Sequence, residues 1–136
     1  MPEYTINLNH YFDRPVAEVF AALADHDNLS TVFGVPVNRI KDGSTEPNGL
    51  GSVRRIGPPV VGAQETVTAF SLNDRIEYCV TKNGGPIRRH HGEMLFSEVD
   101  GGTALQWTIR FSSLPVVGRL LEKVLSSGIN QGLNRI

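Results

Sequence analysis

Hydrophobic and polar residues alternate at the start of the chain. Tyr4, Ile6, Leu8 and Phe12 fall on one side of an extended chain, and the residues between them are mostly polar. A period of two with one polar face is typical of a half-buried strand. The sequence therefore predicts a β-strand over residues 4–12.

The spacing becomes helical from Pro15 onwards. A proline suits the first turn of a helix, because its missing N–H would have no partner there. Val16, Val19 and Leu23 recur at the interval that forms an apolar stripe on a helix. We predict a helix that begins here, followed by a short helical turn over residues 29–33.

Six strand-like runs follow Gly34 and are separated by sequences typical of turns, such as Asp42-Gly43 and Asn73-Asp74. The runs cover residues 35–41, 52–57, 63–70, 75–81, 88–99 and 103–111. Consecutive strands joined by short turns predict an antiparallel meander.

The helical period returns at Leu114 and continues for about 20 residues, or roughly 30 Å of helix. Ser113 is a suitable cap, and Pro115 falls in the first turn. The apolar stripe of this helix consists of Val117, Leu120, Leu121, Val124, Gly128, Ile129, Gly132 and Leu133. A sheet with one apolar face needs a cover, and this is the longest predicted helix.

These elements predict one α+β domain over residues 1–136, a length that fits a single domain. A seven-stranded bent antiparallel sheet would wrap around the long C-terminal helix. The predicted order is β-α-α-β-β-β-β-β-β-α.

Five motifs resemble, in order and spacing, the START-like helix-grip superfamily (SRPBCC), and most closely its bacterial polyketide cyclase/dehydrase-type members. They are PVAEVF (15–20), GLGSVR (49–54), QETV (64–67), RIEY (75–78) and GTALQW (102–107). The resemblance spans nearly the whole chain and implies the helix-grip fold with an internal cavity. It implies no single reaction, because members include lipid carriers, hormone receptors and cyclases.

Composition excludes several classes of function. The chain carries 13 basic and 14 acidic residues, a net charge of −1, which gives no electrostatic footprint for nucleic acid. Its single cysteine, Cys79, cannot form an internal disulfide. No apolar run reaches the ~18 residues of a membrane span, and the N-terminal residues do not resemble a signal peptide. We expect a cytoplasmic protein without stable membrane insertion, either a monomer or a weak homodimer.

Strand alternation predicts which side chains face the cavity. Glu65 shares its side of the strand with Val67, so we expect it to face inward and to gain a partner or a proton, because an unpaired buried carboxylate is costly. The predicted ligand-binding residues are Arg54, Glu65, Val67, Tyr78, His90, Met94, Trp107, Val124 and Gly128. A few polar groups in an apolar cup are typical of a ligand site. The same residues also fit a buried Arg54–Glu65 ion pair and a core histidine.

Two further features bear on the site. Gly128 and Gly132 each cost a helix roughly 1 kcal/mol relative to alanine, which suggests that a ligand or Trp107 approaches the helix there. His90 and His91 face opposite sides of a strand, so we expect no metal site. We also expect no cofactor, because no phosphate loop or dinucleotide fingerprint is present. His26 is expected in an exposed loop.

Three functions remain open. The first is binding of a small apolar or aromatic metabolite by a carrier, sensor or sequestering protein. The second is a cyclase or dehydratase-type enzyme that uses Glu65 or His90 as acid or base. The third is an interaction protein whose cavity is filled. The mostly apolar lining and the lack of a catalytic signature favour the first.

Overall fold

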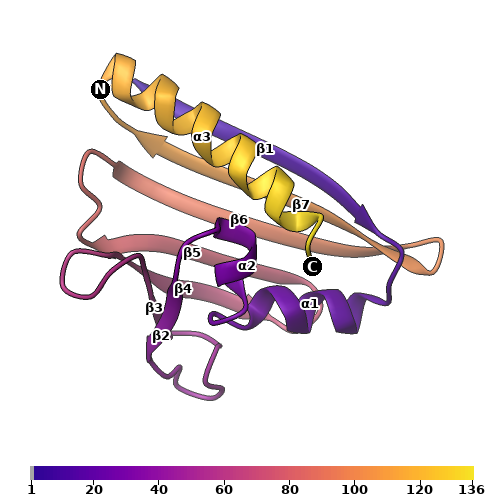
Figure 1. Cartoon of the computed structure of the whole chain (residues 1–136). Coiled ribbons are helices and arrows are strands. Elements are labelled where there is room, and N and C mark those ends of the chain that lie inside the picture. Colours follow the sequence, from indigo (N-terminus) through magenta and orange to yellow (C-terminus); the bar gives the residue numbers. More distant parts are fainter. Residues whose placement is uncertain (1) are drawn as a thin grey trace.

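The computed structural model describes residues 2–136 and has the α+β helix-grip architecture that the sequence predicts (Figure 1). The elements are β1 (Glu3–Phe12), α1 (Val16–Ala24), α2 (Leu29–Phe33), β2 (Val37–Lys41), β3 (Val53–Ile56), β4 (Ala63–Ser71), β5 (Arg75–Lys82), β6 (Arg88–Val99), β7 (Gly102–Ser112) and α3 (Pro115–Leu133). The predicted order of strands and helices is therefore confirmed.

The strands form one antiparallel sheet in the order β1-β7-β6-β5-β4-β3-β2. β1 pairs with β7 along its full length, from Glu3 opposite Ser112 to Phe12 opposite Thr103. α3 runs beside β1 and β7 on one face of the sheet, and its C-terminal part contacts α2 (Figure 1). This arrangement encloses the apolar face of the sheet between the strands and the helices.

Trp107 of β7 lies at the centre of the core. It is completely buried, and its ring packs edge-on against Phe33 of α2, with the ring centroids 6.0 Å apart. Leu105, Ile109 and Phe111 are buried on the same side of β7, whereas the side chains between them are less buried. The predicted inward face of this strand is confirmed.

The glycines of α3 correct the expectation for this helix. Gly132 is where another element approaches closely: a Cβ at that position would lie 1.9 Å from the carbonyl oxygen of Val32 in α2. Gly118 similarly makes room for the ring of Tyr4. Gly128, in contrast, is exposed, and a Cβ there would have no neighbour within 4 Å. Trp107 therefore does not account for this glycine.

The apolar stripe of α3 is also wider than the surface that it buries. Leu120 and Val124 remain 62% and 59% exposed, whereas Ile129 and Leu133 are buried. The buried pair lies in the C-terminal half of α3, towards the end that meets α2. None of the helices within residues 2–136 has the length and hydropathy needed to span a membrane.

Candidate functional site

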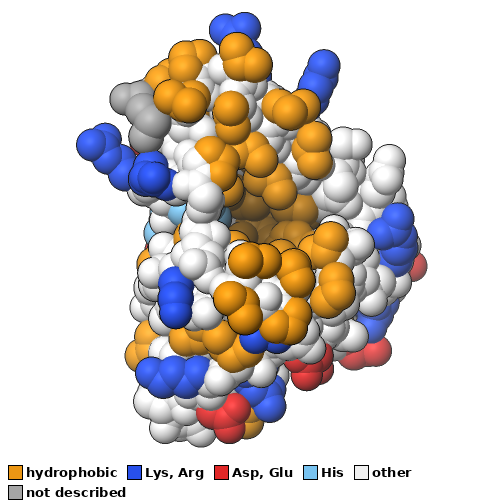
Figure 2. All heavy atoms as spheres, turned by 60° about the vertical axis from the view of Figure 1, so that its left-hand side comes forward, with side chains coloured by type: hydrophobic (Ala, Val, Ile, Leu, Met, Phe, Trp, Pro, Cys, Tyr) orange, Lys and Arg blue, Asp and Glu red, His pale blue; other side chains and the backbone are white. Residues whose placement is uncertain are grey.

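A cavity of about 330 Å³ lies between the sheet, α2 and α3. It is lined by Phe33, Val35, Ile56, Ala63, Glu65, Tyr78, Val80, Gly84, Ile87, His90, Ile109, Val124, Leu125 and Ile129. Val35 and Val124 are also exposed to solvent, so they mark the entrance. Figure 2 shows a hollow in the surface with hydrophobic side chains around its rim. The cavity is therefore an apolar pocket that a small molecule can enter from solvent.

Glu65 enters the cavity from β4 and is held from behind by Arg54 of β3. The two residues are directly paired across the strands, and both are buried. Nε and Nη2 of Arg54 lie 2.8 and 2.7 Å from the same oxygen, Oε1 of Glu65. This ion pair occupies Oε1 and leaves Oε2 facing His90.

A buried polar chain continues behind Arg54. Its Nη1 lies 3.4 Å from Nδ1 of His26, and Nε2 of His26 lies 2.8 Å from Oγ of Ser52. Burial, together with the positive charges of Arg54 and Arg39, lowers the pKa of His26 to about 3. His26 is therefore neutral at pH 7 and can act as a hydrogen-bonding partner in this network.

His90 reaches the cavity from an irregular part of β6. The register between β6 and β7 shifts between Arg88 and His91, and Arg89 has a positive φ of 52°. His90 nevertheless shares its side of the strand with Gly92 and Met94, which pair with Ile109 and Trp107 on the inward face. The backbone N–H of Val80 donates to Nδ1 of His90 at 3.1 Å, and Nε2 points to Oε2 of Glu65 at 3.7 Å. Burial lowers the pKa of His90, although Glu65 opposes this effect.

Tyr78 connects the polar end of the cavity to the core. Its ring lies beneath the guanidinium of Arg54, 4.4 Å from ring centroid to Cζ, and its hydroxyl accepts a hydrogen bond of 2.8 Å from Nε1 of Trp107. Burial raises the pKa of Tyr78 well above its usual value, so the hydroxyl stays protonated at pH 7. Gly92 on β6 makes room for the ring, because a Cβ there would lie 2.1 Å from it.

Comparison with known proteins agrees with this architecture. A family model described as polyketide cyclase / dehydrase and lipid transport matches residues 5–136. The chain belongs to this family. The family is compatible both with binding of hydrophobic ligands and with cyclase/dehydrase-like chemistry. No protein in the curated set matches the sequence significantly.

Solved structures show that this cyclase/dehydrase family member shares its fold with distant relatives. A protein from Thermobifida fusca is 20% identical, with a TM-score of 0.76 over 96% of this chain and 88% of that one. The protein Ara h 8.0201 is 16% identical, with a TM-score of 0.72 over 98% and 97% of the two chains. A protein from Nitrosospira multiformis is 16% identical, with a TM-score of 0.68 over 94% of each chain. At these identities the similarity concerns the fold alone.

The predicted site residues of this family member fall into three groups. Glu65, Tyr78, His90 and Val124 line the cavity. Arg54 lies behind Glu65, while Val67, Met94 and Trp107 are buried in the core without lining the cavity. The expectation for Gly128 is corrected, since it is exposed and lies outside the cavity. Strand alternation identifies the side of the sheet that a residue faces, but not its position relative to a cavity.

Sequence reasoning also missed residues. His26 was expected in an exposed loop, yet it is 1% exposed and bonded to Ser52. One signal was present: Ser52 has the same strand parity as Arg54, which makes it a possible inward partner. Phe33, Val35 and Ile87 line the cavity from a helix end and loops, where no periodicity indicates direction.

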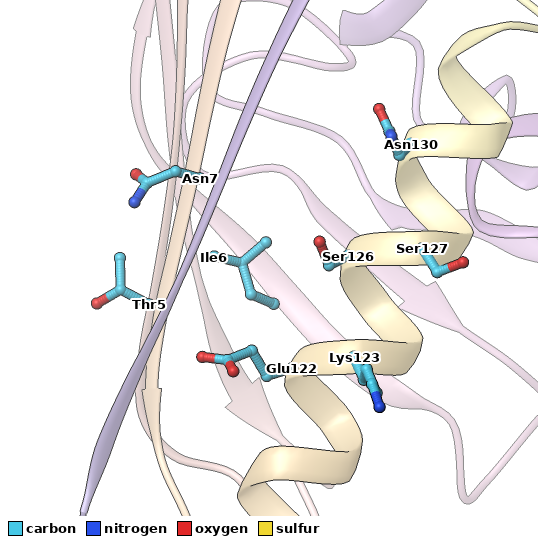
Figure 3. Close-up of a pocket in the computed structure, with 8 residues that line it drawn as sticks. All are labelled: Thr5, Ile6, Asn7, Glu122, Lys123, Ser126, Ser127 and Asn130. Carbon is cyan, nitrogen blue, oxygen red and sulfur yellow. The ribbon is translucent and has the colours of Figure 1, made fainter.

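A second hollow, between β1 and α3, has a different character (Figure 3). It is lined by Thr5, Ile6, Asn7, Glu122, Lys123, Ser126, Ser127 and Asn130. Figure 3 shows Glu122 directed towards β1, whereas Lys123 and Ser127 point away from it. Ile6 is the one hydrophobic residue of this lining. The hollow therefore lacks the apolar interior expected of a ligand site.

The histidine on the other side of β6 belongs to the outer face. His91 is partly exposed and its Nε2 lies 2.8 Å from Oε1 of Glu77. Across residues 2–136, no three His, Cys, Asp or Glu side chains gather in a way that could hold a metal ion.

Proposed function

We propose that this protein binds a small, mainly apolar molecule in its internal cavity and acts as a carrier, sensor or sequestering protein. The observation that carries the proposal is the composition of the cavity. Its wall is mostly aliphatic and aromatic, and the charged and ionisable side chains Glu65, His90 and Tyr78 are few. Ligand sites commonly combine such a wall with a few polar groups that orient the ligand, in volumes of roughly 300–1,000 Å³.

A cyclase or dehydratase-type enzyme is the second candidate. Oε2 of Glu65 and Nε2 of His90 lie 3.7 Å apart at the cavity, so both could reach one group of a bound molecule. A positioned acid or base typically accelerates a reaction by a factor of about 10²–10⁴. Binding remains the first choice, because most of the cavity wall is apolar. A filled-cavity interaction protein is disfavoured by the open volume itself.

Closing the entrance tests the proposal. Val124→Phe places a larger side chain at the mouth of the cavity, and Val116→Phe makes the same change at an 82% exposed position of the same helix. The neutral fluorescent probe N-phenyl-1-naphthylamine should bind the unaltered protein and the Val116 variant alike. We expect the Val124 variant to bind the probe about tenfold more weakly, which corresponds to a loss of ~1.4 kcal/mol in binding free energy.

A second change approaches the cavity from the sheet. Ala63→Leu adds volume to the wall beside Glu65 and should also reduce probe binding. If both variants are folded and bind the probe as tightly as the unaltered protein, the cavity is not the binding site.

A further inference from the structure

Two hydrogen-bonding atoms face each other at the polar end of the cavity without forming a bond. Nε2 of His90 lies 3.7 Å from Oε2 of Glu65, which is longer than the limit of a normal hydrogen bond. Among residues 2–136, neither atom has another hydrogen-bond partner. Both side chains are nearly buried, with 7% and 8% of their surface exposed, and both line the cavity.

The role of each atom is determined by its other contacts. Nδ1 of His90 accepts the N–H of Val80, so the proton of the neutral ring is on Nε2. Burial lowers the pKa of His90, which favours this neutral form. Nε of Arg54 donates to Oε1 of Glu65, and Nη2 lies 2.7 Å from the same oxygen, so Oε2 is left as an acceptor. The cavity thus presents one donor beside one acceptor.

We infer that the ligand is an uncharged, mainly apolar molecule with a hydroxyl group, an alcohol or a phenol, that bridges His90 and Glu65. The inference rests on the proposed function and narrows its ligand class. The hydroxyl oxygen accepts from Nε2 of His90, and its proton is donated to Oε2 of Glu65. An oxygen ~2.8 Å from each atom can span the gap between them. A hydroxyl suits this position because one atom both donates and accepts.

Other polar groups fit less well. A ketone or ether oxygen can accept from His90, but it leaves Oε2 of Glu65 without a donor. An ammonium group can donate to Glu65 but offers no acceptor to His90. A carboxylate would place a second negative charge beside Glu65, whose own charge is already matched by Arg54. The paired charges of Arg54 and Glu65 therefore favour a neutral ligand over an ion.

A series of bicyclic aromatic compounds tests the inference on the unaltered protein. 2-Naphthol, 2-methoxynaphthalene, naphthalene and 2-naphthoate share one ring system, and each competes with bound N-phenyl-1-naphthylamine at pH 7. We expect 2-naphthol to bind about 10- to 100-fold more tightly than 2-methoxynaphthalene, which keeps the acceptor and loses the donor. 2-Naphthoate should bind more weakly than 2-naphthol.

A matched pair of variants assigns the effect to the cavity. His90→Phe keeps an aromatic ring and removes the donor, and His91→Phe makes the same change on the outer face of β6. The His90 variant should lose about tenfold in the preference for 2-naphthol over naphthalene, and the His91 variant should retain it. Far-UV circular dichroism establishes whether each variant is folded. If the His90 variant is unfolded, the binding of the four compounds to the unaltered protein tests the inference on its own.

The outcomes separate this inference from the proposed function. Equal binding of 2-naphthol and 2-methoxynaphthalene would overturn the hydroxyl site and leave the proposed function standing. Binding of 2-naphthoate more tightly than 2-naphthol would also overturn the hydroxyl site. It would indicate instead that the positive charge of Arg54 attracts an anionic ligand. If neither the probe nor any compound of the series binds the folded protein, the proposed function itself fails.

Discussion

Arg54 and Glu65 form a buried ion pair across β3 and β4, with Nη2 2.7 Å from Oε1. The pair stands between the cavity and the polar chain behind it, so Glu65 has a structural role as well as a place in the cavity wall. Removing one partner of such a pair leaves an uncompensated buried charge, whereas replacing both partners by apolar residues is often neutral. A single substitution of Glu65 therefore changes stability and ligand contact together.

We expect Glu65→Leu and Arg54→Met each to lower the free energy of unfolding by about 3–5 kcal/mol. The double variant Arg54→Met/Glu65→Leu should lose less than the two single changes added together. Urea unfolding followed by circular dichroism measures all three variants. Additive losses would mean that the two side chains do not stabilise each other.

The hydrogen bond from Trp107 to Tyr78 leads to a second prediction. Trp107→Ala removes a fully buried ring and should cost about 3–5 kcal/mol. Trp107→Phe keeps most of the packing but leaves the hydroxyl of Tyr78 without its donor, for which we expect about 1–3 kcal/mol. Because Trp107 is the single tryptophan of the chain, unfolding should be followed by circular dichroism. A stability of the Phe variant equal to that of the unaltered protein would contradict a contribution from this bond.

Much of the fold could be predicted from the sequence, because the strands and helices follow clear periods. Alternation correctly placed Glu65, Tyr78 and His90 on the side that lines the cavity. The α3 stripe was less informative, since its apolar residues continue beyond the surface that α2 and the sheet cover. Helical period indicates a shared face, but it does not show which part of that face meets another element.

Gly128 and Gly132 therefore provide a matched pair within one helix. Gly128→Ala should raise the free energy of unfolding by up to ~1 kcal/mol, because the position is exposed and alanine favours the helix. Gly132→Ala should lower it by about 1–3 kcal/mol, because the new methyl group would meet the carbonyl of Val32 and force α3 away from α2. Thermal unfolding measures both variants. A change of both melting temperatures in the same direction would contradict this packing.

His26 shows why the rest of the site escaped sequence reasoning. It follows α1 in a polar segment, Asp25 to Asn28, that has the composition of an exposed turn. Its burial depends on Ser52 and Arg54, which lie far along the chain and reach it only after the sheet has formed. The parity of Ser52 indicates a possible inward partner, but the pattern around His26 itself does not, so a buried histidine and a solvated one look alike in that segment.

The same burial makes His26 a source of acid sensitivity. Its pKa falls from 6.5 in the unfolded chain to about 3 in the folded protein, because burial and then Arg54 disfavour the charged ring. Below pH 6.5 the unfolded state binds more protons than the folded state, so stability decreases as the pH falls towards about 3 and is unaffected by this group above pH 6.5. The slope contributed by one such histidine reaches at most about 1.4 kcal/mol per pH unit. Burial lowers the pKa of His90 too, which adds to the decrease in the same direction.

Urea unfolding between pH 7.5 and about 4 checks this linkage. His26→Gln keeps a group that can bond to Ser52 and removes the titrating ring, so its stability should decrease less steeply below pH 6.5 than that of the unaltered protein. The comparison rests on the slopes, because the substitution also changes the stability at neutral pH. Parallel slopes for the two proteins would show that His26 takes up its proton as readily in the folded state as in the unfolded chain, and that the buried chain from Ser52 to Arg54 does not hold it neutral.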